Sequence, residues 1–210
     1  MAIYKGNKKV VAVYKGSTPI NKIYKGSTLV FQKSGGGGGN THLFEGTATG
    51  AFNLRINDSK DIPITPDADG KWFYDTDEQI TSLVDAFSHV TAVTSVVSNL
   101  DLTGISTALM FDGASNITSI KFNNTKSMKP TQVSSMFSGC TSLVSLDLGL
   151  FDTSNISKPW FATNIFENCT SLSTIKCTQA FKDWCITRQD AIQLPTAMRE
   201  GGSGTWEIVD

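Results

Sequence analysis

The chain has 210 residues, of which 40% are hydrophobic and 18% are charged, and its formal net charge is −1. This hydrophobic fraction is sufficient for a packed core, and the near-neutral charge argues against a nucleic-acid partner. The charge is unevenly distributed, because residues 1–33 contain seven lysines and no acidic residue, which leaves a net charge of −8 for the remainder. We therefore expect the two parts to meet different partners, although lysines on edge strands also serve simply to prevent aggregation.

The first 33 residues repeat with a period of ten. Ile3-Tyr4-Lys5-Gly6 recurs as Val13-Tyr14-Lys15-Gly16 and as Ile23-Tyr24-Lys25-Gly26. Each copy has the composition of a strand that ends in a glycine turn, so we predict a β-repeat arm over residues 1–33, folded as a meander. Because so small an arm has little core, we expect it to dock on a partner or to self-associate. The residues assigned to this docking are Tyr4, Tyr14, Tyr24, Lys5, Lys15 and Lys25.

A glycine run follows the arm and separates it from the rest of the chain. Residues 35–39 are all glycine, so residues 34–40 are predicted to be a flexible linker with a reach of roughly 12 Å. Such a run is typical both of an engineered linker and of a natural hinge. The domain that follows is predicted to span residues 41–210.

Residues 41–85 are predicted to form an N-terminal β cap of this domain. Residues 52–56 alternate apolar and polar side chains, and residues 71–74 have strand composition. The turn between them contains Asp67-Ala68-Asp69-Gly70, which resembles the start of a calcium loop but lacks the later ligands. We therefore predict a plain turn there.

A longer repeat decides the expected fold. Four phenylalanines lie 24, 26 and 29 residues apart, and each is followed by further core positions six, nine and eleven residues later. The phenylalanines are Phe87, Phe111, Phe137 and Phe166; the following positions are Val93, Val96 and Ser98 in the first copy, Ile117, Ile120 and Phe122 in the second, Leu143, Leu146 and Leu148 in the third, and Leu172, Ile175 and Cys177 in the fourth.

The spacing within each copy predicts one short strand, preceded by a short helix that closes the coil from the other side. Because one repeat cannot cover its own apolar face, neighbouring repeats must stack. The predicted fold class is therefore α+β and β-rich, a small solenoid of four repeats over residues 86–177 with β caps, the C-terminal cap spanning residues 178–210.

The four cysteines fit no zinc-binding spacing. Cys140 and Cys169 occupy the same repeat position, which places them on adjacent coils. Two packed free thiols are favoured there, and a disulfide is the alternative.

These repeats carry a family resemblance. The pattern Met-Phe-x-x-Cys-Thr-Ser-Leu-x-x-Leu-x-Leu, clearest at residues 136–148 and 165–177, together with the connecting residues 151–156, resembles the BspA-type leucine-rich repeats and the related repeats of mycoplasma surface lipoproteins. The resemblance covers residues 83–185 and implies a right-handed leucine-rich-repeat solenoid used for adhesion or protein binding. The first copy, at residues 87–91, lacks the Gly-Cys-Thr-Ser element, as is expected of a terminal repeat.

The arm resembles a different group of proteins. Its tandem Ile-Tyr-Lys-Gly-Ser-Thr units are similar to repeats in fibre and tail-associated virion proteins of phages that infect Bacteroides-type bacteria. This resemblance implies that the arm attaches to the virion and that the C-terminal part is displayed.

No motif of catalytic chemistry is present. The sequence contains no Gly-x-Ser-x-Gly elbow, phosphate loop or HExxH, so we predict no catalytic residue, no metal site and no cofactor. His42 and His89 are predicted to be surface residues. The carboxylate pairs are predicted to be solvated, although sequence leaves open a pair of distant acids that meet in space. These pairs are Asp58 with Asp61 and Asp75 with Asp77.

Tryptophans supply the candidates for ligand binding. Trp160 and Phe161 follow Pro159 in the longest connection between repeats, where an exposed contact surface competes with a buried position. Trp184 and Trp206 are predicted to seal the C-terminal end of the core.

The expected function rests on the two resemblances and on targeting signals. The first ten residues lack the apolar region of a signal peptide, and no stretch approaches the ~20 apolar residues of a transmembrane helix. We therefore expect assembly in a host cytoplasm, no membrane partner, and a place in a virion as a phage structural protein of head-fibre, tail-fibre or decoration type.

The expected partners differ between the two parts of the chain. Other virion proteins would bind residues 1–33, a host-surface glycan or protein would bind residues 41–210, and the chain would form a homo-oligomer. The alternative is a bacterial surface leucine-rich-repeat adhesin or interaction module, and a third hypothesis is an enzyme acting on cell-surface polysaccharide.

Overall fold

The computed structural model describes residues 42–123 and 126–209 with their side chains, and six strands within residues 1–41 by their backbone. Contacts divide the chain into two compact units, Met1–Thr41 and His42–Asp210. The predicted linker over residues 34–40 lies outside the described residues. Each unit is therefore described by itself.

The strands of the first unit form three hairpins, each a separate two-stranded antiparallel sheet. They are β1 (Tyr4–Lys5) with β2 (Lys8–Lys9), β3 (Val13–Lys15) with β4 (Thr18–Ile20), and β5 (Lys22–Lys25) with β6 (Thr28–Gln32). The predicted meander is wrong in this respect, because each ten-residue period accommodates both strands of a hairpin and satisfies their hydrogen bonds locally. The tyrosines and lysines assigned to docking end β1, β3 and β5, and their side chains lie outside the described residues.

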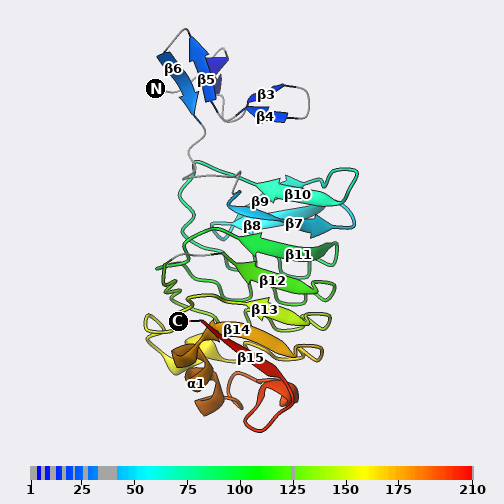
Figure 1. The fold of residues 1–210 in the computed structure, drawn as a ribbon, viewed down its shortest axis with the longest axis vertical. Helices are drawn as coiled ribbons and strands as arrows, with labels where there is room; N and C mark the ends of the chain where they lie inside the picture. The colour runs from blue at the N-terminus through cyan, green and yellow to red at the C-terminus, as the bar shows by residue number, and fades with distance from the viewer. Residues whose placement is uncertain are drawn as a thin grey trace. The chain divides into compact units, whose positions relative to one another are not determined.

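The second unit is built on a seven-stranded mixed sheet with the order β10-β7-β11-β12-β13-β14-β15 (Figure 1). Its strands are β7 (Phe44–Ala48), β10 (Lys71–Tyr74), β11 (Val93–Ser98), β12 (Ser119–Phe122), β13 (Ser145–Asp147), β14 (Thr174–Thr178) and β15 (Thr205–Val209). The strands from β11 to β15 are parallel, whereas β7 is antiparallel to both β10 and β11. A separate hairpin joins β8 (Phe52–Ile56) to β9 (Lys60–Ile64).

Parallel pairing follows from the repeat. Each of the four copies contributes one strand, and the positions nine residues after the phenylalanines are directly paired, Val96 to Ile120, then to Leu146 and Ile175. These side chains are buried, as are those six and eleven residues after each phenylalanine. The repeat alignment therefore predicted the core side of the sheet correctly, including Ser98, whose buried hydroxyl accepts the Leu100 N–H.

The repeated phenylalanines form one continuous stack inside the unit. Ring centroids of Phe87 and Phe111 lie 5.1 Å apart, and those of Phe137 lie 5.7 Å from both Phe111 and Phe166, with interplanar angles of 4° to 11°. All four rings are at most 1% exposed. Each of the four repeat copies, called a coil below and numbered in chain order, contributes one ring. Together the rings fill the side of the core that faces away from the sheet.

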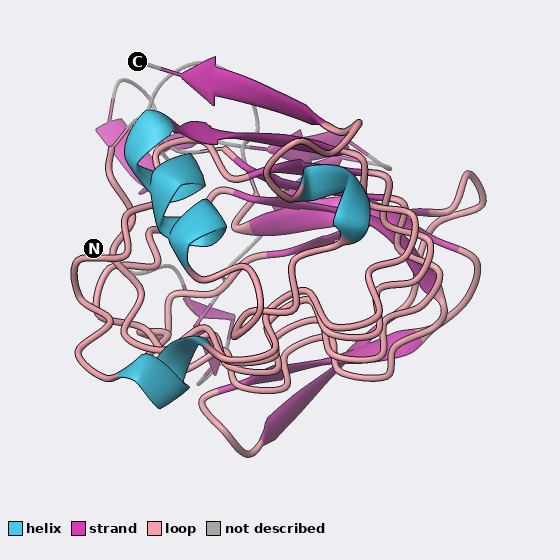
Figure 2. Ribbon diagram, turned by 90° about the horizontal axis from the view of Figure 1, so that it is seen from below, coloured by secondary structure: helices cyan, strands magenta, loops and turns pink. Residues whose placement is uncertain are grey.

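The segment that carries each phenylalanine is a series of turns and not the predicted short helix. Its amide groups alternate between two kinds of acceptor. In the first coil, the N–H groups of Ala86 and Ser88 donate within the coil to residues three positions earlier, whereas those of Phe87 and His89 donate to the next coil, at Met110 and Asp112. Figure 2, seen along the stack, shows these turns lying opposite the large sheet.

Left-handed backbone at two fixed positions explains why no helix forms in these turns. The residues two before and two after each phenylalanine have positive φ, which interrupts helical hydrogen bonding and turns every second N–H toward the neighbouring coil. The residues are Asp85, Leu109, Ser135 and Asn164 before the ring, and His89, Gly113, Gly139 and Asn168 after it.

The last coil is closed by a different element. The helix α1 (Gln179–Thr187) follows β14, with the Thr178 hydroxyl accepting the Phe181 N–H as its N-cap, and it buries Phe181 and Cys185. This unit also contains two 3₁₀ turns, η1 (Pro159–Ala162) and η2 (Thr196–Met198). Trp184 and Trp206 are partly buried against the core, which agrees with their predicted position at its end.

The described residues therefore form a β-rich α+β fold with a single α-helix and mixed sheets. Within the same part of the chain, no helix has the length and apolar composition of a membrane span.

Candidate functional site

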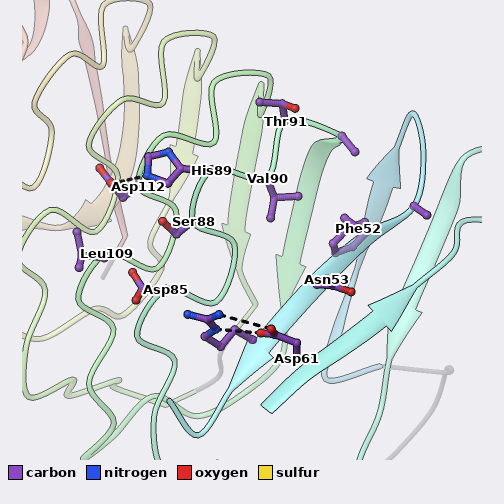
Figure 3. A pocket seen from close by; sticks show the side chains of 13 residues that line it. Phe52, Asn53, Asp61, Asp85, Ser88, His89, Val90, Thr91, Leu109 and Asp112 are labelled. Atoms are coloured by element: carbon purple, nitrogen blue, oxygen red, sulfur yellow. Dashed lines mark hydrogen bonds and ion pairs between the residues drawn. The ribbon is translucent and has the colours of Figure 1, made fainter. Parts of the chain in front are cut away.

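The second unit carries an open groove of about 720 Å³ on its turn side (Figure 3). It lies between the β8–β9 hairpin and the turns of the first two coils. Its lining includes one guanidinium and three carboxylates, which belong to Arg55, Asp61, Asp85 and Asp112. It also includes Asn53, Ser88 and the ring of His89.

The groove exists because β8 separates from the first coil partway along. The N–H groups of Arg55 and Asn57 donate to the carbonyls of Ala86 and Ser82, so this end of β8 continues the hydrogen-bond ladder between coils. The next carbonyl, that of Ser88, has no donor among the residues that the structure describes. The corresponding carbonyl of the second coil, at Asp112, accepts the His89 N–H.

A backbone donor faces the same opening. In a strand, the N–H groups of alternate residues point to the same edge, so Asn53 presents its N–H on the edge used by Arg55. The groove therefore offers an open backbone donor on β8 and an open backbone acceptor on the first coil. Paired polar groups of this kind favour a ligand that both accepts and donates hydrogen bonds.

Ion pairs fix the charged side chains of the groove. Arg55 Nε donates to Asp61 Oδ1 at 2.9 Å across the β8–β9 hairpin, and this hydrogen bond lowers the pKa of Asp61 and raises that of Arg55. On the opposite wall, His89 Nε2 lies 3.7 Å from Asp112 Oδ2. Figure 3 shows the two pairs on either side of Asp85, which lines the groove between them.

The His89 ring is held over a glycine of the next coil. A Cβ at Gly113 would lie 2.2 Å from His89 Nδ1, so a side chain there would displace the ring. The His89 side chain is 78% exposed, which agrees with its predicted surface position. The groove is lined by half-buried and exposed planar polar groups, namely carboxylates, a guanidinium, an imidazole and an amide. These groups are suited to hydrogen bonding with a polyhydroxylated or peptide-like ligand.

The predicted ligand-binding residues lie elsewhere on the unit. Trp160 and Phe161 are part of η1, and the Trp160 side chain is exposed (61%). Lys158 Nζ lies 5.1 Å from the centre of the Trp160 ring, and the Phe161 ring packs edge-on against it. The Phe161 carbonyl accepts the Val133 N–H, so the turn that carries Trp160 is tied to the preceding coil.

Two other predicted surface groups have defined partners. His42 is not a freely solvated residue, because its Nδ1 lies 2.7 Å from Asp75 Oδ2 and its ring stacks on Phe73 at 4.0 Å. Asp58 accepts a hydrogen bond from the Ser82 hydroxyl. Asp58, Asp61 and Asp77 are exposed, as predicted for the carboxylate pairs. Asp75 is half-buried against His42, a partner that the sequence does not reveal.

The predicted metal-free turn and thiols can be compared directly with the structure. Asp67 Oδ1 accepts the N–H groups of Asp69 and Lys71, which makes residues 67–71 a turn closed by its own carboxylate. No cluster of three or more potential metal ligands occurs within the described residues.

The cysteines are free and buried, as predicted, and the thiols of Cys140 and Cys169 donate to the phenylalanine carbonyls of the preceding coil.

Sequence reasoning missed the groove, because its walls come from segments far apart in the chain. One signal was available within the cap. Arg55 and Asp61 flank a short turn at Asn57-Asp58, and in a hairpin of this length they stand directly opposite each other, as the structure shows. No comparable signal links this hairpin to residues 85–112.

Comparisons with protein-family models, with curated proteins and with solved structures found no match.

Proposed function

We propose that the chain is a virion structural and attachment protein, in which residues 1–33 bind the particle and residues 42–210 are displayed to bind a surface ligand. The observation that carries the proposal is the division into two units of different composition. One consists of three short hairpins with seven lysines and no acidic residue in residues 1–33, and the other is a stack of coils with an excess of acidic residues.

The displayed unit is proposed to be a leucine-rich-repeat solenoid. The parallel register of β11 to β14 and the stacked phenylalanines support this assignment, because both place equivalent repeat positions on top of one another. In this proposal, turns linked by alternating hydrogen bonds replace the short helices of the original prediction. Stacked repeats of this kind present large, rigid surfaces and are typical of binding proteins.

Two surfaces of the displayed unit support a binding role. The groove combines an open backbone donor and acceptor with exposed carboxylate and guanidinium groups, which suits the hydroxyl groups of a surface glycan. Trp160 adds an exposed aromatic ring beside the Lys158 ammonium group. We propose the groove as the principal site because it is concave and offers more polar groups.

The attachment role can be tested in the source virus. Full-length chain and a variant lacking residues 1–33, both carrying a C-terminal tag, would be supplied during infection and quantified by immunoblot in gradient-purified particles. We expect the full chain in particles and the truncated chain at background level. A third variant with Tyr4, Tyr14 and Tyr24 changed to serine keeps the arm's length and charge, and is expected to be reduced as well. Incorporation of the truncated chain at full-length levels would refute the docking role.

The binding role requires a separate measurement. A glycan array probed with the tagged full-length chain should give a limited set of ligands, and Asp85→Asn should weaken binding to them at least ten-fold. Trp160→Ala serves as the matched surface variant, because Trp160 lies outside the groove. Loss of binding with Trp160→Ala and retention with Asp85→Asn would transfer the site to η1.

A further inference from the structure

The outward face of the large sheet carries a row of alternating charges. Paired residues of four neighbouring strands are Lys121 on β12, Asp147 on β13, Lys176 on β14 and Glu207 on β15. Their strand neighbours Ile120, Leu146 and Ile175 are buried, so the charged side chains point to solvent. Lys176 Nζ and Asp147 Oδ2 are 3.5 Å apart, and Lys121 and Glu207 are exposed at the two ends of the row.

A second row of small polar side chains runs beside the charges on the same face. Successive strand pairings align hydroxyl residues on six strands, from the cap to the last strand. They are Thr47, Ser95, Ser119, Ser145, Thr174 and Thr205. Because these side chains are short, they allow close approach of another surface.

We propose that this face binds the same face of a second copy of the chain. The argument is charge complementarity under two-fold symmetry. A two-fold axis parallel to the strands and placed between β13 and β14 sets β12 of one copy against β15 of the other, and β13 against β14. Lys121 then faces Glu207 of the second copy and Asp147 faces Lys176, so that the row forms four intermolecular opposite-charge contacts.

Other placements of the axis do not give this complementarity. An axis through β13 would place Asp147 against Asp147 of the second copy. The row extends from Lys121 through Val97 on β11 to Glu45 on β7. An axis between β12 and β13 would therefore place Glu207 against Glu45. An axis along the charged row, perpendicular to the strands, would set each charge against itself. Like charges held in opposition are unfavourable. An axis between β14 and β15 opposes no like charges but forms only two opposite-charge contacts, between Lys176 and Glu207, so the arrangement with four contacts is favoured.

The dimer is expected to be weak and sensitive to salt. Four strands spaced about 4.8 Å apart and about 17 Å long give a face of roughly 300 Å², well below the ~800 Å² that each partner buries in a stable complex. We therefore expect a dissociation constant of about 100 μM to 1 mM at physiological salt, decreasing as the ionic strength falls. The contact goes beyond the proposed function, because it does not depend on a virion or a glycan.

Charge reversal of the full-length chain tests the arrangement. Lys121→Glu and Glu207→Lys each set two pairs of like charges opposite one another, and each should weaken association in sedimentation equilibrium at least ten-fold. The double variant exchanges the charges and should recover wild-type association to within about three-fold. An equimolar mixture of the two single variants should form heterodimers, because each then supplies the charge that the other requires. Lys126→Glu is the matched control, an exposed lysine outside the sheet, and should associate like wild type.

A cross-linking measurement separates this contact from association through residues 1–41. Ser119→Cys and Thr205→Cys face each other in the proposed dimer at about the 10 Å spacing of packed sheets, whereas two copies of either residue are several strands apart. The native cysteines are buried, so a short bismaleimide should join the two variants when they are mixed and neither variant to itself. Equal cross-linking in the mixture and in the single variants, or single charge reversals without effect on association, would overturn the proposal.

Discussion

The phenylalanine stack makes a quantitative prediction about stability. Phe137 packs against rings on both sides, Phe111 and Phe166, whereas Phe166 is stacked on Phe137 alone among the described rings. Both side chains are at most 1% exposed, so their burial is equal. Phe137→Leu and Phe166→Leu therefore remove a similar apolar volume and differ mainly in the number of stacked pairs that they break.

The expected destabilisation follows from the pairs. Stacked aromatic pairs contribute about 0.5–1.5 kcal/mol each beyond their buried area. Phe137→Leu should therefore lower the free energy of unfolding by about 1–3 kcal/mol through lost stacking, and Phe166→Leu by about half as much. The cost of the altered shape is similar at the two sites and cancels in their difference, which is about 1 kcal/mol. Phe111→Leu, which also breaks two stacked pairs, should match Phe137→Leu.

Urea unfolding monitored by tryptophan fluorescence and by circular dichroism measures these differences. Coincident transitions and unchanged m-values would show that a two-state treatment holds for each variant. The reasoning is refuted if Phe166→Leu is as destabilising as Phe137→Leu, because the cost would then depend on burial and not on stacking.

Two further predictions concern the turns and the thiols. Gly139→Ala should lower the free energy of unfolding by more than about 1–2 kcal/mol, because the residue has φ of +72° and a Cβ would lie 3.1 Å from Gly113 Cα. The control is Gly104→Ala, which has φ of +77° and open space around it and should show the backbone cost alone in the same urea assay. An equal loss of stability in both variants would contradict the steric argument. Burial raises the pKa of Cys169 to about 12 from 9.0, so as pH rises the thiol loses its proton in the unfolded chain before it does so in the folded chain. The free energy of unfolding should therefore fall between pH 9 and 12, by up to about 1.4 kcal/mol per pH unit for this thiol. Unfolding of Cys169→Ala across this range should show a shallower decline, and an unchanged slope would mean that the thiol does not contribute.

The sequence correctly predicted the elements that are determined by local residue patterns. The strands β8 and β10 have the predicted limits, because alternation of side chains and turn residues at both ends are visible in the sequence. The repeat positions also identified the inward-facing side chains of β11 to β14, since a fixed spacing produces the same environment in each coil. The strand β15 was missed as a continuation of the sheet, because residues 205–209 carry none of the phenylalanine repeat and pair with β14 only through the stack.

The turn segments show why the rest could not be predicted. Whether the Phe87 N–H bonds within its own coil or to Met110 of the next coil depends on the presence of that coil, which is not a property of the local sequence. Leu109 and Ser135 have positive φ without being glycine, so residue type did not reveal them either. The groove depends on the point at which β8 separates from the first coil. That contact between distant segments is likewise not a property of the local sequence.

The position of the groove also determines how the unit would carry mechanical load. His42, where the second unit begins, lies two residues before Phe44, the first residue of β7, and the groove lies between the cap hairpin and the first two coils. Tension between His42 and a ligand held in the groove would therefore pass through the cap and the first two coils, while the coils of Phe137 and Phe166 would remain outside the loaded path. Mechanical strength would then be a property of the β7–β11 pairing and the bonds between β8 and the first coil, and the far coils could lengthen or shorten the molecule without altering the force at which it releases.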